Sequence, residues 1–343
     1  MNDDCFGDLP QTPEEMRQRL PELSNDQKVA YAHKAILPYS YYDQVFAEID
    51  ECRRIRKFRT EPPCLFVGGR TNTGKTTIAE KYEKKYPKET LKDRNISPVL
   101  YVRMKSPPTD STVCDQVLLA ISPAADLRGR TTLRTGSLEG LLKDGRTEVL
   151  ILDEVQGFYR NKRVETTLAL SDWIKDLSGN AHIVIVLIGI PKAENLFSLN
   201  EQLSRRFPRR IMIQPFSYDS DEREKEFNTT LGDADYAMPF QVPANLDSPD
   251  MASRICYSSN GYIGFVSDLI RGAAILGLDR GSECITRELL AESFMKTIQN
   301  HFPFKINPFQ RKKFSRDQAL EMMKAERLKA EEAERRKKLK DEE

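Results

Sequence analysis

With 343 residues, 39 % of them apolar and 31 % charged, the chain can hold one large α/β domain and a smaller one. No apolar stretch reaches the roughly 20 residues of a membrane-spanning helix, and the acidic N-terminus lacks the layout of a signal peptide, so we expect a cytoplasmic protein with no membrane partner. The 53 basic residues balance 52 acidic ones, which neither indicates nor excludes nucleic acid as a partner.

In chain order, residues 1–25 carry three prolines among polar residues and are predicted to form a loose arm. Helical periodicity follows from residue 25 to about residue 59 and ends at two prolines. Short apolar runs then alternate with helical stretches, a pattern typical of a parallel sheet between helices, and the predicted fold class is α/β. The predicted strands are 64–67, 99–102, 149–152, 183–188 and 211–213.

Beyond residue 215 the strand pattern ends. Residues 222–300 are predicted to form a small all-α domain, and the last residues are nearly all charged, with too few apolar side chains to build a core. The predicted domains are an arm (1–34), an α/β ATPase domain (35–218), a helical lid (219–305) and a charged tail (306–343).

A phosphate-binding pattern follows the first predicted strand. Residues 69–76 match G-x-x-x-x-G-K-[ST] in full, between an apolar strand and a helical stretch, as this motif requires. Its backbone N–H groups can surround phosphate oxygens, while Lys75 contacts the β- and γ-phosphates of ATP and Thr76 holds Mg²⁺. The predicted nucleotide-binding residues are Gly69, Arg70, Thr71, Asn72, Thr73, Gly74, Lys75, Thr76 and Thr77.

An acidic pair ends the third predicted strand. Asp153 and Glu154 follow four apolar residues and would lie at the carboxyl edge of the sheet, where open α/β sheets bind ligands. We expect Asp153 to hold the magnesium shell. Glu154 is predicted to orient and activate the attacking water, which makes it, with Lys75, a catalytic residue.

Two arginines precede the fifth predicted strand. An arginine donated by a neighbouring subunit can stabilise charge on the γ-phosphate during transfer. Arg206 is the first candidate for this role and Arg205 the second. A solvated basic cluster with Arg209 and Arg210 is the alternative interpretation.

The order of these motifs resembles that of AAA+ ATPases. A closer resemblance is to the TniB/TnsC family, the ATP-dependent target-selection regulators of bacterial transposons, among them those of CRISPR-associated transposons. It rests on Ile-Leu-Asp-Glu-Val-Gln at 151–156, Val-Leu-Ile-Gly-Ile-Pro at 186–191 and Asn-Gly-Tyr-Ile-Gly at 260–264, and it covers roughly residues 35–300.

The resemblance implies an ATP-bound ring or helical homo-oligomer around duplex DNA, which is recruited by a TniQ-like targeting factor and marks a target for a transposase. Hydrolysis would drive disassembly. Two departures from the AAA+ pattern indicate slow turnover: residues 188–190 offer no polar sensor-one side chain, and Gly264-Phe265-Val266 stands where a sensor-two arginine is common.

DNA contacts are expected between the second and third strands, where cations and hydroxyl groups could meet phosphates. A solvated loop is the alternative interpretation of any one of these residues. The candidates are Lys105, Arg128, Arg130, Arg134 and Lys143, with Thr131 and Thr132 as hydroxyl donors.

Two other functions compete with transposition control. A replication initiator or helicase loader of the AAA+ type should carry a further DNA-binding domain after the lid, and residues 301–343 are too short and too charged for one. A scaffold that holds ATP without cleaving it would not need Glu154.

Overall fold

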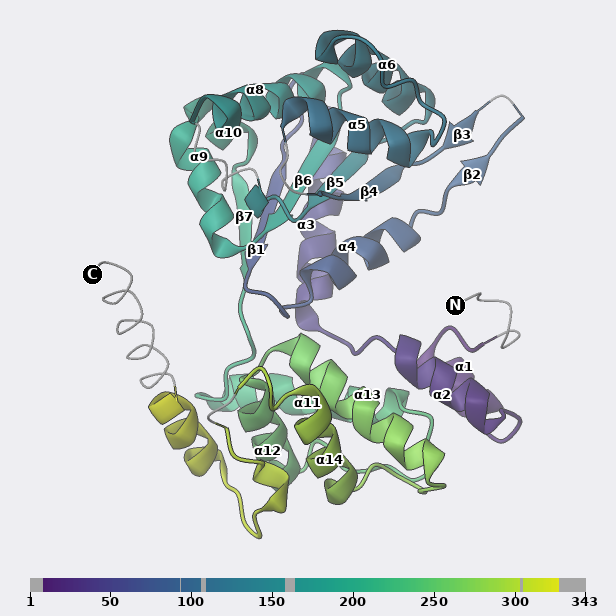
Figure 1. Cartoon of the computed structure of the whole chain (residues 1–343), viewed down its shortest axis with the longest axis vertical. Coiled ribbons are helices and arrows are strands. Elements are labelled where there is room, and N and C mark those ends of the chain that lie inside the picture. The colour runs from purple at the N-terminus through teal and green to yellow at the C-terminus, as the bar shows by residue number, and fades with distance from the viewer. Residues whose placement is uncertain (1–8, 93, 106–108, 158–163, 303–304, 327–343) are drawn as a thin grey trace. The chain divides into compact units, whose positions relative to one another are not determined.

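A five-stranded parallel sheet organises residues 40–214, one of two units into which the chain divides (Figure 1). The second unit joins residues 1–39 to residues 215–343. The computed structural model describes residues 9–92, 94–105, 109–157, 164–302 and 305–326, with the side chains of residues 164–166 and 199 left out.

The sheet has the spatial order β4-β5-β6-β1-β7 and confirms the predicted α/β class. Its strands are β1 (Leu65–Gly69), β4 (Val99–Arg103), β5 (Val149–Asp153), β6 (Val184–Gly189) and β7 (Arg209–Ile213). All neighbours run parallel, so the carboxyl ends of all five strands meet at one edge. An antiparallel pair, β2 (Glu89–Thr90) and β3 (Asn95–Ile96), was not predicted, because strands of two residues leave no periodic pattern.

Helices cover both faces of the sheet. On one side, α3 (Ser40–Arg56) and α4 (Lys75–Lys84) contact the central strands. The other side carries α5 (Asp110–Ile121), α6 (Thr131–Asp144), α8 (Val164–Asn180), η2 (Pro191–Asn195), α9 (Leu196–Leu199) and α10 (Glu201–Arg206).

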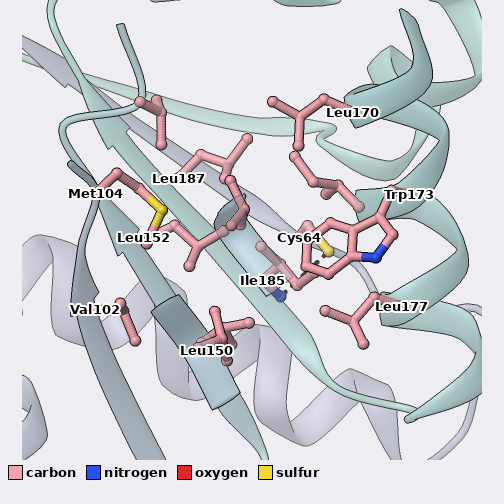
Figure 2. Packing of buried hydrophobic residues seen from close by; sticks show 14 of the residues in the cluster. Cys64, Val102, Met104, Leu150, Leu152, Leu170, Trp173, Leu177, Ile185 and Leu187 are labelled. Atoms are coloured by element: carbon pink, nitrogen blue, oxygen red, sulfur yellow. Dashed lines mark hydrogen bonds between the residues drawn. The ribbon is translucent and has the colours of Figure 1, made fainter. Parts of the chain in front are cut away.

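The apolar core on this second side is built from alternate strand residues. Leu150 and Leu152 of β5 and Ile185 of β6 point toward the α8 side chains Leu170 and Trp173 (Figure 2). Because side chains alternate along a strand, the residues between them face α3 and α4 instead. Burial on both faces explains the continuous apolar runs from which the strands were predicted.

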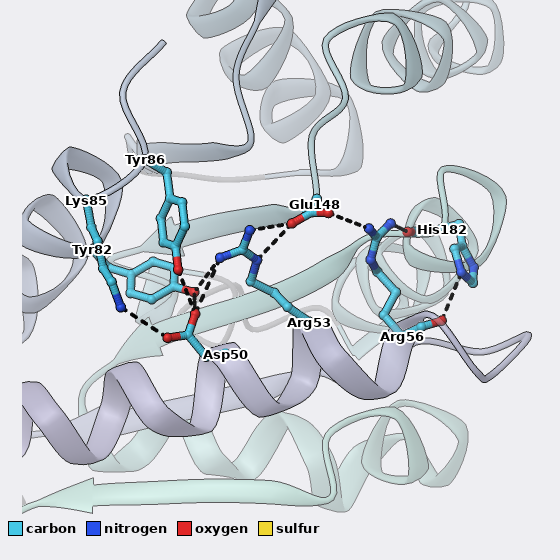
Figure 3. A network of polar contacts seen from close by, with 8 residues as sticks. All are labelled: Asp50, Arg53, Arg56, Tyr82, Lys85, Tyr86, Glu148 and His182. Atoms are coloured by element: carbon cyan, nitrogen blue, oxygen red, sulfur yellow. Dashed lines mark hydrogen bonds and ion pairs between the residues drawn. The ribbon is translucent and has the colours of Figure 1, made fainter.

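A polar network holds α3 at the amino edge of the sheet (Figure 3). Glu148, next to the start of β5, accepts from Arg53 (Nε at 3.0 Å) and from Arg56 (Nη2 at 3.0 Å). Arg56 also donates to the carbonyl of His182, just before β6, at 2.7 Å. The network therefore ties one helix to two strands.

The helical unit contains α11 (Asp221–Ala237), α12 (Pro249–Ser259), α13 (Ile263–Asp279) and α14 (Arg287–Thr297), preceded in the chain by α1 (Pro13–Arg19) and α2 (Asn25–Lys34). The prediction of a loose arm is wrong for residues 13–19, which form α1 and pack on α11; α2 packs on α13, and residues 1–8 lie outside the described residues. Arg17 donates to the carbonyls of Tyr236 (2.9 Å) and Phe240 at the end of α11. The single helix predicted from residue 25 is interrupted between α2 and α3, around Pro38.

Residues 305–326 also differ from the prediction of a solvated tail, while residues 327–343 lie outside the described residues. After η3 (Pro308–Gln310), residues 316–326 are helical, and Phe309, Phe314 and Met323 are buried. Two buried cations attach this segment to α12: Arg254 of α12 binds the carbonyl of Arg311 at 2.9 Å, and Lys305 contacts both Glu326, at 3.0 Å, and the carbonyl of Tyr257 on α12. The segment packs with few apolar residues because buried ion pairs and contacts to backbone carbonyls satisfy its polar groups.

No single helix within the described ranges is long and apolar enough to cross a membrane. The pair α12 and α13 passes that test only when both are taken together, and they are bent by 117° at their junction.

Candidate nucleotide-binding site

The loop between β1 and α4 contains two residues in the left-handed region. Asn72 and Gly74 have φ values of 65° and 81°, and Gly74 is the N-cap of α4. A side chain at Gly69 would place its Cβ 2.7 Å from Thr73 Oγ1, so this position requires glycine. Thr73 is buried and donates to the carbonyl of Arg70 at 2.7 Å, which closes the loop from within.

Lys75, the first residue of α4, points back into the loop. Its Nζ donates to the carbonyl of Arg70 at 2.7 Å and lies 3.4 Å from Thr73 Oγ1. Burial lowers the pKa of the Lys75 ammonium, and the carboxylates of Asp153 and Glu154 oppose that shift. The cation is thus held within the loop, next to the acidic pair.

Thr76 and Asp153 converge although 77 positions separate them in the chain. The Thr76 hydroxyl donates to Asp153 Oδ2 at 2.7 Å, and Asp153 is buried at the end of β5. A hydroxyl and a carboxylate side by side are oxygen ligands of the kind Mg²⁺ prefers. The residues present therefore fit the predicted metal, and Thr76 and Asp153 are the side chains that would hold it.

Glu154 lies one residue beyond β5 with a φ of 65°, a left-handed conformation that is uncommon outside glycine. Its N–H donates to Asp153 Oδ1 at 2.7 Å. The carboxylate is held on one side by Gln156 Nε2 and on the other by Arg103, whose Nη2 lies 3.5 Å from Oε1. Glu154 therefore sits beside the metal ligands but is engaged by two neighbours.

Three residues of this site were not predicted from the sequence. Tyr101 on β4 donates its hydroxyl to Asp153 Oδ2 at 3.1 Å, and burial together with that carboxylate raises the Tyr101 pKa. Arg103 ends β4 and Gln156 follows Glu154. Tyr101 and Arg103 could have been found only from the pairing of β4 with β5, which places Arg103 opposite Asp153.

The end of β6 carries no polar side chain, as the sequence analysis expected. Gly189 is the last residue of the strand, and a Cβ there would lie 3.0 Å from the side chain of Val155. The same Cβ would lie 3.4 Å from Gln156 Oε1. Gln156 therefore supplies the polar atom closest to the position where a sensor residue is expected.

The two candidate arginines lie at the opposite edge of the sheet. Arg206 ends α10, and its carbonyl accepts from the N–H of Cys64, which precedes β1, at 2.8 Å. One strand length, roughly 16 Å for five residues, separates this edge from the phosphate loop. The Arg206 side chain is 11 % exposed and pairs with Glu61, whereas that of Arg205 is 76 % exposed and pairs with Glu201.

The candidate DNA contacts divide into two groups. Lys105, Arg128 and Arg130 are exposed, and Thr131 is half-buried as the first residue of α6. Arg134 instead binds Asp115 and lies 2.8 Å from the Ser111 hydroxyl of α5. The structure thus engages Arg134 between two helices and leaves the other cations at the surface.

The sheet order, the phosphate loop and the acidic pair define a P-loop nucleotide-binding protein with the core of the AAA+ ATPases. Among known structures, Cdc6p of Pyrobaculum aerophilum matches with a TM-score of 0.56 and 15 % identity, covering 81 % of this chain and 72 % of that one. The ORC2 protein of Aeropyrum pernix, in ADPNP-ADP complexes, matches with 0.51 and 14 %, over 74 % and 69 % of the two chains. The ORC1 protein of Aeropyrum pernix in complex with DNA matches with 0.52 and 16 %, over 76 % and 66 %. At such identities the likeness concerns the fold.

Sequence comparison then gives the family. Residues 28–216, more than half of the chain, match the family model described as Bacterial TniB protein. The chain belongs to the TniB family of bacterial transposition proteins, which confirms the predicted family. A search of curated proteins finds no match.

Proposed function

We propose that this protein binds and slowly hydrolyses MgATP. The observation that carries the proposal is the 2.7 Å contact between Thr76 and Asp153, directly beside Lys75 and Glu154. A P-loop threonine and a strand-end aspartate meet in this way in enzymes that transfer the γ-phosphoryl group.

In the proposed mechanism the N–H groups of the loop and the ammonium of Lys75 bind the phosphates. Thr76 and Asp153 would hold magnesium, which would supply neutralisation of the phosphate charge. Glu154 accepts a proton from the attacking water and orients it. Arg103 and Gln156 restrain Glu154, so the carboxylate must be released before it can act, which adds to the expectation of slow turnover.

The test is phosphate release by Glu154→Gln. The amide cannot accept a proton, so turnover should fall at least a hundredfold while ATP affinity, measured by calorimetry, stays within about threefold of wild type. Glu51→Gln, on α3 and paired with Arg54, removes a carboxylate away from the loop and should retain wild-type turnover. Equal phosphate release by Glu154→Gln and wild type would remove Glu154 from its role.

Assembly is the second part of the proposal. An arginine one strand length from its own phosphate loop can reach only the nucleotide of a neighbouring copy, which makes ATP binding and self-association interdependent. Arg206→Ala should therefore leave the ATP affinity of a dilute single subunit unchanged but reduce both assembly and turnover at high protein concentration. Loss of turnover in the single subunit itself would contradict a role in trans.

We propose that the assembly binds duplex DNA. Arg128 and Arg130 lie at the beginning of α6, where Arg130 is the N-cap and the helix dipole adds positive potential, and Lys105 follows the end of β4. The ORC1 protein, which is similar in fold, is known in complex with DNA, and this is consistent with the proposal. Arg130→Ala should weaken DNA binding several-fold and lower its salt dependence, whereas replacement of the exposed Lys84 in the last turn of α4 by alanine should not.

The family resemblance extends the proposal to two protein partners. The assembled, ATP-bound form would be placed on DNA by a TniQ-like targeting factor and would recruit the transposase, and hydrolysis would end that state. Pull-down of each partner on DNA, with ATP and with ADP, tests this step. Recovery that does not depend on the nucleotide would contradict it.

A further inference from the structure

Arg206, the candidate that is proposed to act in trans, already holds an anion within its own subunit. Its Nη2 lies 3.0 Å from Glu61 Oε1. The Arg206 side chain is 11 % exposed, but that of Glu61 is 72 % exposed. A carboxylate open to water therefore covers the outer side of an almost buried guanidinium.

The backbone of the loop that carries Glu61 restrains the ion pair between Glu61 and Arg206. Glu61 precedes Pro62 and Pro63, and a residue before proline is restricted to extended conformations. At the end of the same loop, the N–H of Cys64 donates to the carbonyl of Arg206 itself at 2.8 Å. Because the backbone fixes both partners in register, the pair loses less conformational entropy than an ordinary surface ion pair.

The surroundings of the pair are cationic. Arg59, Arg205 and Arg206 line a hollow of about 440 Å³ beside the exposed ring of Phe58, and Glu61 is the one acidic residue among the described residues that line it. Arg206 Nη1 is buried and has no hydrogen-bond partner within the described part of the chain. Arg59 and Arg205 beside the paired Arg206 leave an excess of positive charge, which fits a phosphate-bearing group.

We propose that Glu61 is a built-in counter-ion that occupies Arg206 in the free subunit and gives way to the γ-phosphate of a neighbouring copy's ATP. This inference rests on the proposed function, in which Arg206 acts in trans. The terminal phosphate of ATP carries more charge than one carboxylate and displaces it, whereas ADP offers no γ-phosphate and leaves the Glu61 pair intact. Glu61 is thus a positioning residue that sharpens the discrimination between ATP and ADP during assembly.

Glu61→Gln tests the proposal, because it keeps the shape of the side chain and removes the charge. Assembly is followed by sedimentation with a slowly hydrolysed ATP analogue and with ADP. The analogue concentration for half-maximal assembly should fall roughly two- to fivefold, and ADP should support more assembly than in wild type. The matched control is Glu201→Gln, which removes the partner of Arg205 and should leave both values unchanged.

A double mutant distinguishes a specific effect of the Glu61–Arg206 pair from a general effect of removing one negative charge. In an Arg206→Ala background, Glu61→Gln should have no further effect on assembly, since its partner is gone. The inference would be overturned if Glu61→Gln assembled with the nucleotide dependence of wild type, or if it assembled more weakly than wild type. It would also be overturned if Glu61→Gln still changed assembly in the Arg206→Ala background. If wild type itself fails to assemble with the ATP analogue, the proposed function fails instead.

Discussion

Replacing Arg254 by methionine tests how the C-terminal segment is attached. Arg254 is fully buried on α12; its Nε and Nη2 each lie 2.8 Å from a carboxylate oxygen of Asp250. Its Nη1 donates to the carbonyls of Pro308 and Arg311, the latter at 2.9 Å. Methionine retains the apolar stem but removes every one of these donors.

The expected decrease in the free energy of unfolding of Arg254→Met follows from the contacts that Arg254 makes. Two backbone carbonyls lose a charged donor, at about 1.5–3 kcal/mol each, while Asp250 is half exposed and regains water. Because the substitution also relieves the burial of a charge, we expect a net loss of about 2–4 kcal/mol in the free energy of unfolding. For a unit of this size that corresponds to a melting temperature lower by about 5–15 °C.

Thermal unfolding of Arg254→Met is compared with Arg280→Met. Arg280 pairs with Glu292 at the surface of the same unit and is 54 % exposed, so its replacement should cost less than about 1 kcal/mol. Limited proteolysis should also reach residues 305–326 earlier in Arg254→Met. Equal melting temperatures of the two variants would refute the reasoning.

Three further outcomes are expected. Lys75→Ala should abolish ATP binding by calorimetry and with it assembly, because Lys75 is the cation that the phosphate loop itself encloses; normal affinity would show that the loop is not the site. Arg103→Ala should raise basal phosphate release up to about fivefold by freeing the Glu154 carboxylate, and a decrease would mean that Arg103 assists turnover. Ending the chain after Glu326 should preserve the melting temperature and ATP-dependent assembly. Ending it after Gln310 removes Glu326, the partner of Lys305, and should lower the melting temperature. Equal melting temperatures of the two truncated proteins would contradict the observed packing.

The proximity of the candidate nucleotide-site residues was predictable where they are contiguous in the chain. The phosphate loop and the acidic pair each occupy a single stretch, and the parallel order of β1 and β5 brings Thr76 to Asp153. Tyr101 and Arg103 escaped prediction because nothing local marks them. They belong to the site only through the register of β4 with β5.

The ends of the chain were mispredicted for a different physical reason. Arg17 reaches carbonyls at the far end of α11, and Lys305 is satisfied by Glu326 and the carbonyl of Tyr257. Such long-range polar contacts replace the apolar stripe on which periodicity depends. Charged composition therefore did not imply an unpacked segment.

The most direct test of the account is a structure, by electron microscopy, of the protein on duplex DNA with magnesium and a slowly hydrolysed ATP analogue. We predict an assembly in which the metal lies between Thr76 and Asp153 and Arg206 of the adjacent copy has left Glu61 for the γ-phosphate. Nucleotide bound away from residues 69–76, or monomers without DNA, would contradict it.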